Sequence, residues 1–384
     1  MVSNQKLFSV GSFDFRLQHL LVIGILILSV SISMLMRSGP ASYGYELFEY
    51  DPFFNLRATE YLLENGSDAY FAWIDEKTWH PFGRNVSETS QVTLHFTSAY
   101  MYQIFGSGSS LYDFTVLFPL VIGSLTAVLV FAFVRVLGGT TAGLFAALIF
   151  SISTPILARG LIGWFKSEPL GLFFAFAAMY LFVSGIKFNR GKISAIKLIL
   201  GGLFLAFATS AWGGILFFIL PIALFYLFLP FFKNEKNFSI WAAPAFSISF
   251  ILVTQWFSIL FVGFERPQAF MIGYASIALA LPTIFVIVSE IIKKFSSEKT
   301  KIRNCFIFLA SIIASGIGIS SMGLVGLPSF RYLNAVNPFL TSTDTLTDSV
   351  AEHLTTDIAM SFSILSVFLI FGLIGIWLIF SKRN

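Results

Sequence analysis

The sequence predicts an all-α polytopic membrane protein with about ten transmembrane helices and two long outer loops. Of its 384 residues, 56% are hydrophobic and only 11% are charged, and the mean hydropathy is +0.82. Soluble domains carry about 45–50% apolar and about 25% charged residues, so this composition excludes that class. The spans are expected to be helical because lipid offers no hydrogen-bond partners to open strands. The net charge of +4 is modest, so no nucleic-acid partner is expected.

Ten stretches reach the length of about 20 mostly apolar residues that a helix needs to cross a bilayer. The first is longer than the apolar core of a signal peptide, about 7–15 residues, and is therefore interpreted as a retained anchor. The ten stretches lie near residues 18–37, 112–136, 140–158, 168–186, 194–212, 214–232, 239–263, 268–292, 304–324 and 358–380.

Lysine and arginine predict the orientation of these spans, because cytoplasmic loops are enriched in both. With a cytoplasmic N-terminus, all the strongly basic loops and the C-terminal tail fall inside, at 187–197, 233–236, 293–303 and 381–384. The protein is therefore expected in the cell membrane, with both termini cytoplasmic. Two long segments, about 38–110 and about 325–357, then lie outside. The first carries apolar and aromatic residues throughout, so we expect it to fold, with a short helix over 51–63.

Acidic residues gather at three places on the predicted outer side. Asp51 follows the first span, Glu168 lies at the mouth of the fourth span, and Glu352 precedes His353 late in the second long segment. Oxygen ligands from separate segments are what Mg²⁺ or Mn²⁺ requires. The pattern alone leaves ordinary roles open. Asp51 would cap a helix, Glu168 would pair with Lys166, and Glu352 and His353 would be plain loop residues.

The residues around these acids resemble a known family. Glu49-Tyr-Asp-Pro-Phe-Phe-Asn-Leu-Arg-Ala-Thr-Glu-Tyr61 resembles the first outer-loop motif of the catalytic subunit of oligosaccharyltransferase, in an archaeal form. Five further stretches agree with that family in order: Thr78–Arg84 (Thr-Trp-His-Pro-Phe-Gly-Arg), Arg159–Glu168, Thr209–Gly214 (Thr-Ser-Ala-Trp-Gly-Gly), Arg331–Pro338 and Ser349–His353 (Ser-Val-Ala-Glu-His). Six matches in the same order make the resemblance specific.

The resemblance implies a GT-C-like glycosyltransferase, with residues 1–384 as its transmembrane catalytic domain. Such enzymes move a glycan from a polyprenyl or dolichyl (pyro)phosphate lipid to the asparagine of an Asn-X-Ser/Thr sequon. The implied partners are the lipid-linked oligosaccharide, an acceptor polypeptide with a sequon and membrane lipids. The implied cofactor is Mn²⁺ or Mg²⁺.

The resemblance also implies roles for individual residues. Asp51 and Glu352 would be catalytic, because two carboxylates bonded to the acceptor amide would twist it and release its delocalised lone pair. Asp51, Glu168 and Glu352 would bind the metal ion. The lipid phosphates and substrate would be contacted by Arg159, Lys166, Arg331 and His353.

Two features depart from the family pattern. Lys166 stands where the second acidic motif usually begins with an aspartate, so it would either lower the metal affinity or contact the pyrophosphate as a point charge. The usual soluble C-terminal domain, with its Trp-Trp-Asp-Tyr-Gly motif, is expected to be absent, because no such motif occurs here.

Other functions stay open at this point. They are another GT-C enzyme that uses a lipid-linked sugar, an inactive or partial family member, and a transporter or channel. A transporter would need ionisable residues in the middle of its spans, and these spans carry almost none.

Overall fold

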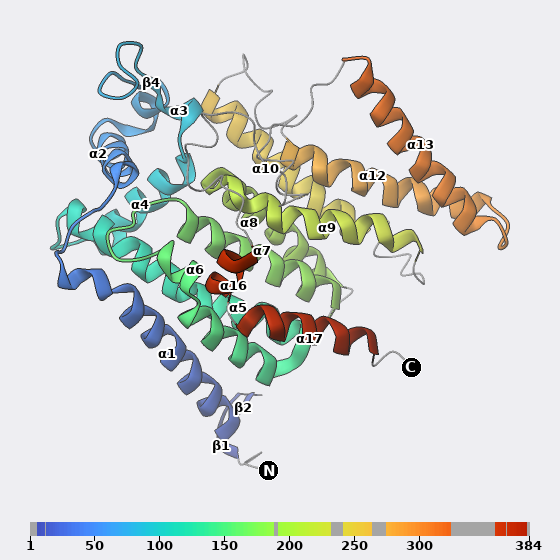
Figure 1. Cartoon of the computed structure of the whole chain (residues 1–384), viewed down its shortest axis with the longest axis horizontal. Helices are drawn as coiled ribbons and strands as arrows, with labels where there is room; N and C mark the ends of the chain where they lie inside the picture. Colours follow the sequence, from blue (N-terminus) through green and yellow to red (C-terminus); the bar gives the residue numbers. More distant parts are fainter. Residues whose placement is uncertain are drawn as a thin grey trace.

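The computed structural model describes residues 6–11, 13–187, 191–231, 241–262, 274–323, 358–365 and 367–381. Within these ranges the chain is mainly helical, with two short antiparallel ribbons (Figure 1). The first ribbon pairs β1 (Lys6–Val10) with β2 (Phe13–Arg16), and the second pairs β3 (Ile74–Asp75) with β4 (Arg84–Asn85).

The described residues form α-helices and three short 3₁₀ helices. In chain order they are α1 (Leu17–Arg37), η1 (Gly39–Ser42), α2 (Tyr50–Phe71), α3 (Val86–Thr89), α4 (Val92–Phe105), α5 (Leu111–Ile152), α6 (Thr154–Ala158), α7 (Glu168–Lys187), α8 (Lys192–Ala211), η2 (Gly213–Ile215), α9 (Leu216–Phe228), η3 (Leu229–Phe231), α10 (Ala243–Val262), α12 (Tyr274–Phe295), α13 (Lys301–Ser321), α16 (Ile358–Leu365) and α17 (Val367–Ser381).

Among the described residues, seven helical segments are long and apolar enough to cross a membrane: Leu17–Arg37, Leu111–Ile152, Glu168–Lys187, Lys192–Ala211, Gly213–Phe231, Ala275–Phe295 and Lys301–Ser321. The protein is thus a multi-pass membrane protein, as predicted. The exact count of ten spans is not confirmed. The predicted stretch 239–263 contains α10, and 358–380 coincides with the two shorter helices α16 and α17. The predicted stretch 112–136 and the first part of 140–158 both belong to α5.

The long helix α5 consists of two antiparallel arms that meet at Gly139. This glycine has φ 87° and ψ 176°, a conformation that side chains disfavour. Beyond it the chain returns along itself, because a Cβ on Gly143 would lie 2.8 Å from the carbonyl oxygen of Phe131. Val130 and Phe150 belong to one buried cluster. The predicted stretches 112–136 and 140–158 therefore correspond to the two arms, and the second arm ends at Ile152.

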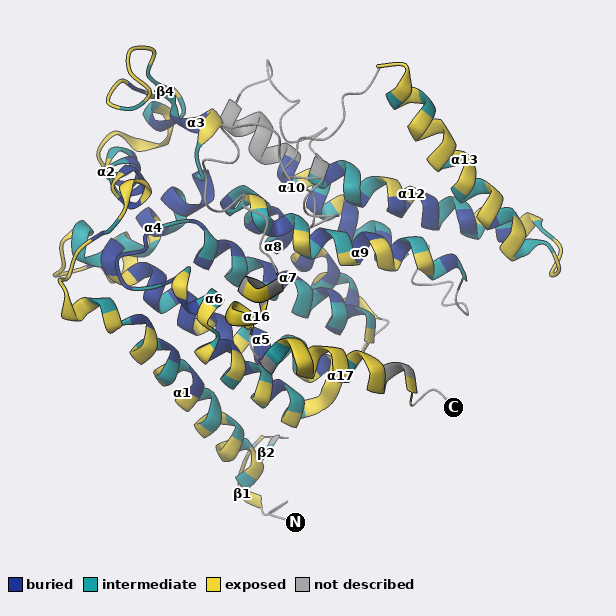
Figure 2. Ribbon diagram, in the orientation of Figure 1, coloured by how far each residue is buried: buried dark blue, intermediate teal, exposed yellow. Residues whose placement is uncertain are grey.

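The main core lies between α7, α8, α9, α10 and α12. The backbones of α8 and α10 approach closely at Gly202, where a Cβ would lie 2.4 Å from the carbonyl oxygen of Phe246. Small residues permit such contacts, which drive helix association in lipid. Figure 2 shows buried residues concentrated in this centre and exposed residues along α13. The exposed face of α13 is apolar, with Ile307, Ile313 and Ile317, as suits contact with lipid.

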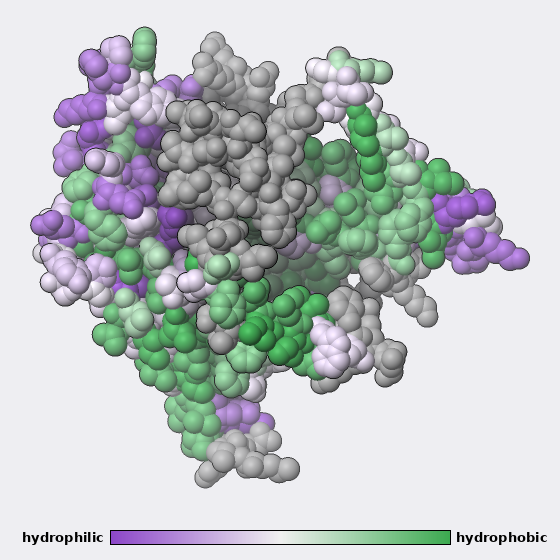
Figure 3. All heavy atoms as spheres, in the orientation of Figure 1, coloured by the Kyte–Doolittle hydropathy of each residue, from purple (hydrophilic) through white to green (hydrophobic). Residues whose placement is uncertain are grey.

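Residues 38–110, called here the 38–110 segment, fold into η1, α2, the β3–β4 ribbon, α3 and α4. Their own buried cluster includes Phe54, Ala58, Tyr70 and Val86. The helix predicted over 51–63 is confirmed and extends to Phe71, with a break in helical geometry at Gly66. Figure 3 shows hydrophilic residues gathered over α2 and the β3–β4 ribbon, whereas the surface over α1 is mostly hydrophobic.

Candidate functional site

Four of the seven predicted site residues lie in the described part of the chain, and they belong to two segments. Asp51 is in the first turn of α2, and Glu168 is the first residue of α7. Arg159 and Lys166 lie between α6 and α7, in residues 159–167, called here the 159–167 loop. The other three predicted residues fall outside the described ranges: Arg331, Glu352 and His353.

The start of α2 presents two carboxylates. Glu49 precedes the helix with φ 71°, a left-handed conformation that is uncommon for residues other than glycine. Asp51 follows in the first turn, where the helix dipole favours negative charge. Both side chains reach solvent, with exposed fractions of 46% for Glu49 and 70% for Asp51.

The 159–167 loop packs directly on the chain that leads into α2. Gly163 has φ 78° and donates its N–H to the carbonyl of Val116 at 2.9 Å. A Cβ on Gly163 would lie 2.1 Å from the carbonyl oxygen of Glu46 and would meet the ring of Phe48. Glycine is therefore required here for both its backbone angle and its size.

A buried chain of hydrogen bonds ties α4 and α2 to this loop. His95 contacts the Tyr70 hydroxyl through Nδ1 at 2.6 Å and Asn55 Oδ1 through Nε2 at 3.0 Å. Asn55 Nδ2 donates to the carbonyl oxygen of Phe165 at 2.9 Å. Since Asn55 Oδ1 accepts, Nε2 of His95 carries the proton and Nδ1 accepts from Tyr70. Burial, with a smaller effect of Arg84, lowers the pKa of His95 to about 3, so the ring stays neutral.

Lys166 joins the loop to both carboxylates of the α2 start. Its Nζ lies 2.6 Å from Glu49 Oε2 and 3.2 Å from Asp51 Oδ2, and its side chain is only 11% exposed. Burial alone would lower the pKa of Lys166, but the hydrogen bond with Glu49 and the charge of Asp51 outweigh it and raise that pKa. The alternative that Lys166 pairs with Glu168 is therefore not what the structure shows.

Glu168 instead pairs with Arg159, whose Nη1 lies 3.5 Å from Glu168 Oε1. The Trp164 ring contacts both cations of the loop: its centroid lies 5.3 Å from Cζ of Arg159 and 4.5 Å from Nζ of Lys166. The other oxygen of Glu168 is buried and meets no donor in full hydrogen-bond geometry among the described residues. Two ion pairs thus flank a single indole.

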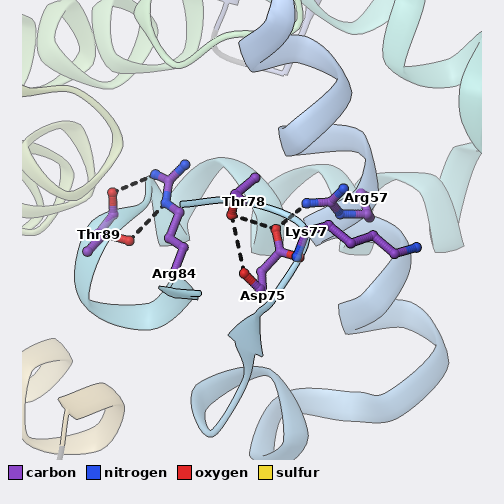
Figure 4. A network of polar contacts seen from close by, with 6 residues as sticks. All are labelled: Arg57, Asp75, Lys77, Thr78, Arg84 and Thr89. Atoms are coloured by element: carbon purple, nitrogen blue, oxygen red, sulfur yellow. Dashed lines mark hydrogen bonds and ion pairs between the residues drawn. The ribbon is translucent and has the colours of Figure 1, made fainter. Parts of the chain in front are cut away.

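Arg84 brings a further positive charge towards Asp51. Its Nε and Nη2 donate to the hydroxyl and the carbonyl of Thr89 at 2.9 and 2.8 Å, and its guanidinium lies 4.0 Å from the centroid of the Phe54 ring. Burial lowers the pKa of Arg84, and the charge of Asp51 opposes this shift, so Asp51 lies within electrostatic reach. Figure 4 shows Arg84 and Thr89 beside a second network centred on Asp75.

Asp75 is the buried centre of that second network. It accepts from the Thr78 hydroxyl at 2.8 Å and from the Lys77 N–H at 3.1 Å, and it forms an ion pair with Arg57 (Figure 4). These contacts bind the β3–β4 ribbon to α2. The two ends of the stretch 78–84 thus take part in these networks, Thr78 through Asp75 and Arg84 through Thr89.

The described residues do not fit a metal centre as they stand. No group of three or more His, Cys, Asp or Glu side chains that would hold a metal ion occurs within the described ranges. Asp51 and Glu168 each face a different cation, and the ammonium of Lys166 lies against the oxygens of Asp51. Glu352, the third predicted ligand, lies outside those ranges.

Three residues of the site were missed by reasoning from the sequence. Glu49 was noted as an acid but given no role, although it is the nearer partner of Lys166. Its position two residues before Asp51 was the available signal. Trp164 lies within the stretch Arg159–Glu168, but its contact with the two cations was not predicted. Asn55 carried no signal, because a buried asparagine is recognised only once its partners are known.

Comparison with known proteins identifies a family match over most of the chain. Residues 40–382 match the family described as "Oligosaccharyl transferase STT3, N-terminal". The chain is 27% identical over 323 residues to the dolichyl-diphosphooligosaccharide–protein glycosyltransferase subunit STT3B of Arabidopsis thaliana, covering 81% of this chain and 43% of that protein. It is 27% identical over 302 residues to the STT3 subunit of Saccharomyces cerevisiae, covering 76% and 39%. The chain thus spans about two fifths of the length of these relatives.

Two solved structures share the fold. One is the archaeal oligosaccharyltransferase AglB from Archaeoglobus fulgidus in complex with an inhibitory peptide and a dolichol-phosphate, with a TM-score of 0.69 and 16% identity, covering 94% of this chain and 44% of that one. The other is the apo form of the Archaeoglobus fulgidus oligosaccharyltransferase, with a TM-score of 0.65 and 20% identity, covering 85% and 40%. At these identities the likeness shows the fold alone.

Proposed function

This chain belongs to the STT3 family of oligosaccharyl transferases, and we propose that residues 1–384 form the membrane catalytic domain of such an enzyme. The proposed reaction transfers a glycan from a polyprenyl or dolichyl (pyro)phosphate lipid to the asparagine of an Asn-X-Ser/Thr sequon. The proposed partners are this lipid-linked oligosaccharide, an acceptor polypeptide and the surrounding lipids.

One observation supports the proposal most directly: two motifs more than 100 residues apart meet in space. The acidic start of α2 contacts the 159–167 loop through the ion pair of Asp51 with Lys166 and the hydrogen bond from Asn55 to Phe165. One segment offers the exposed carboxylate of Asp51 to an acceptor amide. The other offers cations to an anionic donor. A site that joins two such substrates needs both chemistries side by side.

The carboxylate of Asp51 has a defined task in this reaction. An amide nitrogen is a poor nucleophile because its lone pair is delocalised into the carbonyl. A carboxylate that accepts an N–H of the acceptor asparagine favours the conformation in which that lone pair is free. We assign this role to Asp51, and we propose Glu352 as the second carboxylate from the resemblance of its motif.

The cations of the loop suit the other substrate. Arg159 and Lys166 are held on either side of the Trp164 ring. Guanidinium and ammonium groups donate charge-assisted hydrogen bonds to phosphate oxygens, so both are proposed to hold the phosphate of the lipid donor. Arg331 and His353 are proposed for the same substrate from the resemblance of their motifs.

The metal assignment stays a prediction. Asp51, Glu168 and Glu352 with Mn²⁺ or Mg²⁺ follow from the resemblance, and a related structure from Archaeoglobus fulgidus is a complex with Zn and sulfate. The contacts of Lys166 and Arg159 in this chain do not favour an ion between Asp51 and Glu168. The steps above therefore use only the side chains of the protein.

The orientation is also a proposal. A cytoplasmic N-terminus and C-terminus in the cell membrane, with the site on the outer face, follow from the distribution of lysine and arginine. The structure is consistent with one feature of this arrangement: α1, 21 residues long, separates the β1–β2 ribbon from the 38–110 segment. An archaeal source is likewise proposed only from the details of the motifs.

The test is glycopeptide formation in membranes that contain the full chain. A labelled sequon peptide and a polyprenyl-linked glycan are supplied, and a peptide with glutamine in place of the acceptor asparagine serves as the blank. Asp51→Asn should abolish the product. Asp113→Asn is the matched control, because Asp113 is also a first-turn acid, at the start of α5. Full activity of Asp51→Asn would contradict the assignment, and product on a lipid or free sugar acceptor instead would favour another GT-C reaction.

A further inference from the structure

We propose that Lys166 is a built-in cation of this site: its ammonium takes the place beside Asp51 and Glu49 where a divalent metal ion would otherwise bind. The inference deepens the proposed function and rests on it in taking Asp51 as an acid of the transfer site. It differs from the expected metal centre, in which Asp51 would coordinate Mn²⁺ or Mg²⁺.

The geometry of the ammonium is the first argument. Nζ of Lys166 lies 2.6 Å from Glu49 Oε2 and 3.2 Å from Asp51 Oδ2, so it bridges carboxylates from the same end of α2. Mg²⁺ binds carboxylate oxygens at about 2.0–2.1 Å. An ion bound to the same oxygens would therefore lie within a few ångströms of the ammonium, and two cations at that separation repel each other.

The ammonium is also held in place, unlike that of a surface lysine. The Lys166 side chain is 11% exposed, and its Nζ lies 4.5 Å from the centroid of the Trp164 ring. Its backbone N–H donates to the carbonyl of Trp164 at 2.7 Å. The hydrogen bond from Asn55 to Phe165 anchors the adjacent residue to α2. The loop therefore presents Lys166 to the two acids as a fixed feature of the fold.

The surrounding charges leave little attraction for a second cation. Arg159 already pairs with Glu168, the other predicted ligand in the described part of the chain. The charge of Asp51 also raises the pKa of Arg84 against the lowering caused by burial. The two described acids that were expected to bind the metal, Asp51 and Glu168, thus each pair with a cationic side chain of the protein. A divalent ion would have to displace one of these side chains.

The same arrangement gives Lys166 a role toward the donor. A lysine ammonium has three N–H donors, and two of them are directed to Glu49 and Asp51. Because these are its two carboxylate partners among the described residues, the third N–H can serve an anionic oxygen. A phosphate of the lipid donor that accepts a hydrogen bond from this N–H would lie next to Asp51. The ammonium of Lys166 would then balance the negative charge of the phosphate at any metal concentration.

Manganese binding to the purified full chain tests the proposal without donor or acceptor. Free Mn²⁺ is measured by electron paramagnetic resonance for the wild type, Lys166→Met and Lys166→Asp. The two variants should bind Mn²⁺ at least about tenfold more tightly than the wild type, and adding Asp51→Asn should remove the gain. Lys77→Met is the matched control, because Lys77 is an exposed lysine of the 38–110 segment, and it should change nothing.

The proposal is overturned if the wild type binds Mn²⁺ as tightly as Lys166→Met, or if Asp51→Asn weakens binding to the wild type. If the Lys166 variants do not fold, the effect of Mn²⁺ on the wild type alone tests the proposal. Mn²⁺ that raises its unfolding temperature, with the effect lost in Asp51→Asn, refutes the proposal, and no Mn²⁺-dependent rise supports it. Because no substrate is present, a failure of glycan transfer would refute the proposed function and leave this result unaffected.

Discussion

Asn55 and Phe165 are joined by a buried hydrogen bond across 110 residues of sequence, from the side-chain amide of Asn55 to the carbonyl oxygen of Phe165 at 2.9 Å. Asn55 lies one helical turn after Asp51 on α2, and Phe165 directly precedes Lys166. This bond therefore sets the position of the lysine relative to the two acids that it pairs with. The arrangement of the charged side chains at the site thus depends on a hydrogen bond between two uncharged groups.

Replacing Asn55 with leucine should destabilise the protein. The substitution leaves Nε2–H of His95 and the carbonyl of Phe165 buried without partners, and each such group costs about 1–3 kcal/mol. We expect a loss of about 2–4 kcal/mol in the free energy of unfolding, measured as a lower unfolding temperature in detergent. Asn65→Ala is the control on the same helix. Asn65 is exposed, and within the described part of the chain its side chain bonds to the local carbonyl of Tyr61, so its loss should change stability by less than about 0.5 kcal/mol.

Stability should fall as the pH drops below about 6.5, partly because of His95. Its pKa is lowered to about 3 in the folded protein, against 6.5 for the ordinary group, so between these values the unfolded chain binds the proton and the folded chain does not. The contribution of His95 is thus fully present above pH 6.5 and decreases by about 1.4 kcal/mol per unit as the pH falls towards 3.

Unfolding temperatures of the wild type and His95→Gln between neutral and mildly acidic pH measure this effect. The variant should show a shallower pH dependence, because glutamine does not titrate. His80→Gln, at an exposed position, should keep the wild-type slope. Equal slopes for the wild type and His95→Gln would show that His95 is not the titrating group.

Gly163→Ala should be more harmful than Gly66→Ala although both glycines have φ 78°. A Cβ on Gly66 meets nothing within 4 Å, so that change adds only backbone strain, of about 1–3 kcal/mol at φ 78° and ψ 176°. A Cβ on Gly163 would lie 2.1 Å from the carbonyl oxygen of Glu46 and would displace the loop. We expect Gly163→Ala to lower both the unfolding temperature and the transfer rate. A result equal to that of Gly66→Ala would mean that the loop adjusts freely.

Lys166 should react slowly with amine-directed acylating reagents at mildly alkaline pH. Only the neutral amine reacts, and the carboxylates of Glu49 and Asp51 raise the pKa of Lys166 despite its burial. Mass spectrometry of labelled peptides should show Lys77, which is exposed, reacting first. The double substitution Glu49→Gln and Asp51→Asn should speed labelling of Lys166 and leave Lys77 unchanged. Labelling of both lysines at the same rate would contradict the buried ion pair.

The membrane architecture was predictable because its cause acts along the chain. A helix that faces lipid must be apolar over most of its length, so the seven helical segments long enough to span, Leu17–Arg37 among them, can be read directly from composition. The exact number of spans was not predictable from composition. The helix α5 joins the predicted stretch 112–136 to the first part of 140–158 at Gly139, and α16, within the predicted stretch 358–380, has only eight residues.

The site was predictable only in part. Asp51, Arg159, Lys166 and Glu168 were identified from motifs, and the structure brings the α2 start and the 159–167 loop together. The sequence did not predict which cation pairs with which acid. One alternative paired Lys166 with Glu168, and the structure shows that this alternative was wrong. Asn55 and His95 were missed because a polar side chain inside a helix carries no sign of a partner on another segment.

The sequence by itself determined the polytopic helical class, the order of the acidic and basic motifs, and the family, because hydrophobic length and local motifs are properties of contiguous residues. Only the tertiary structure decided that Lys166 bridges Glu49 and Asp51 while Arg159 takes Glu168. The reason is physical: ion pairs act over a few ångströms, and the separation of two distant segments is set by packing, here by a glycine that admits the backbone of Glu46 and an asparagine that holds Phe165.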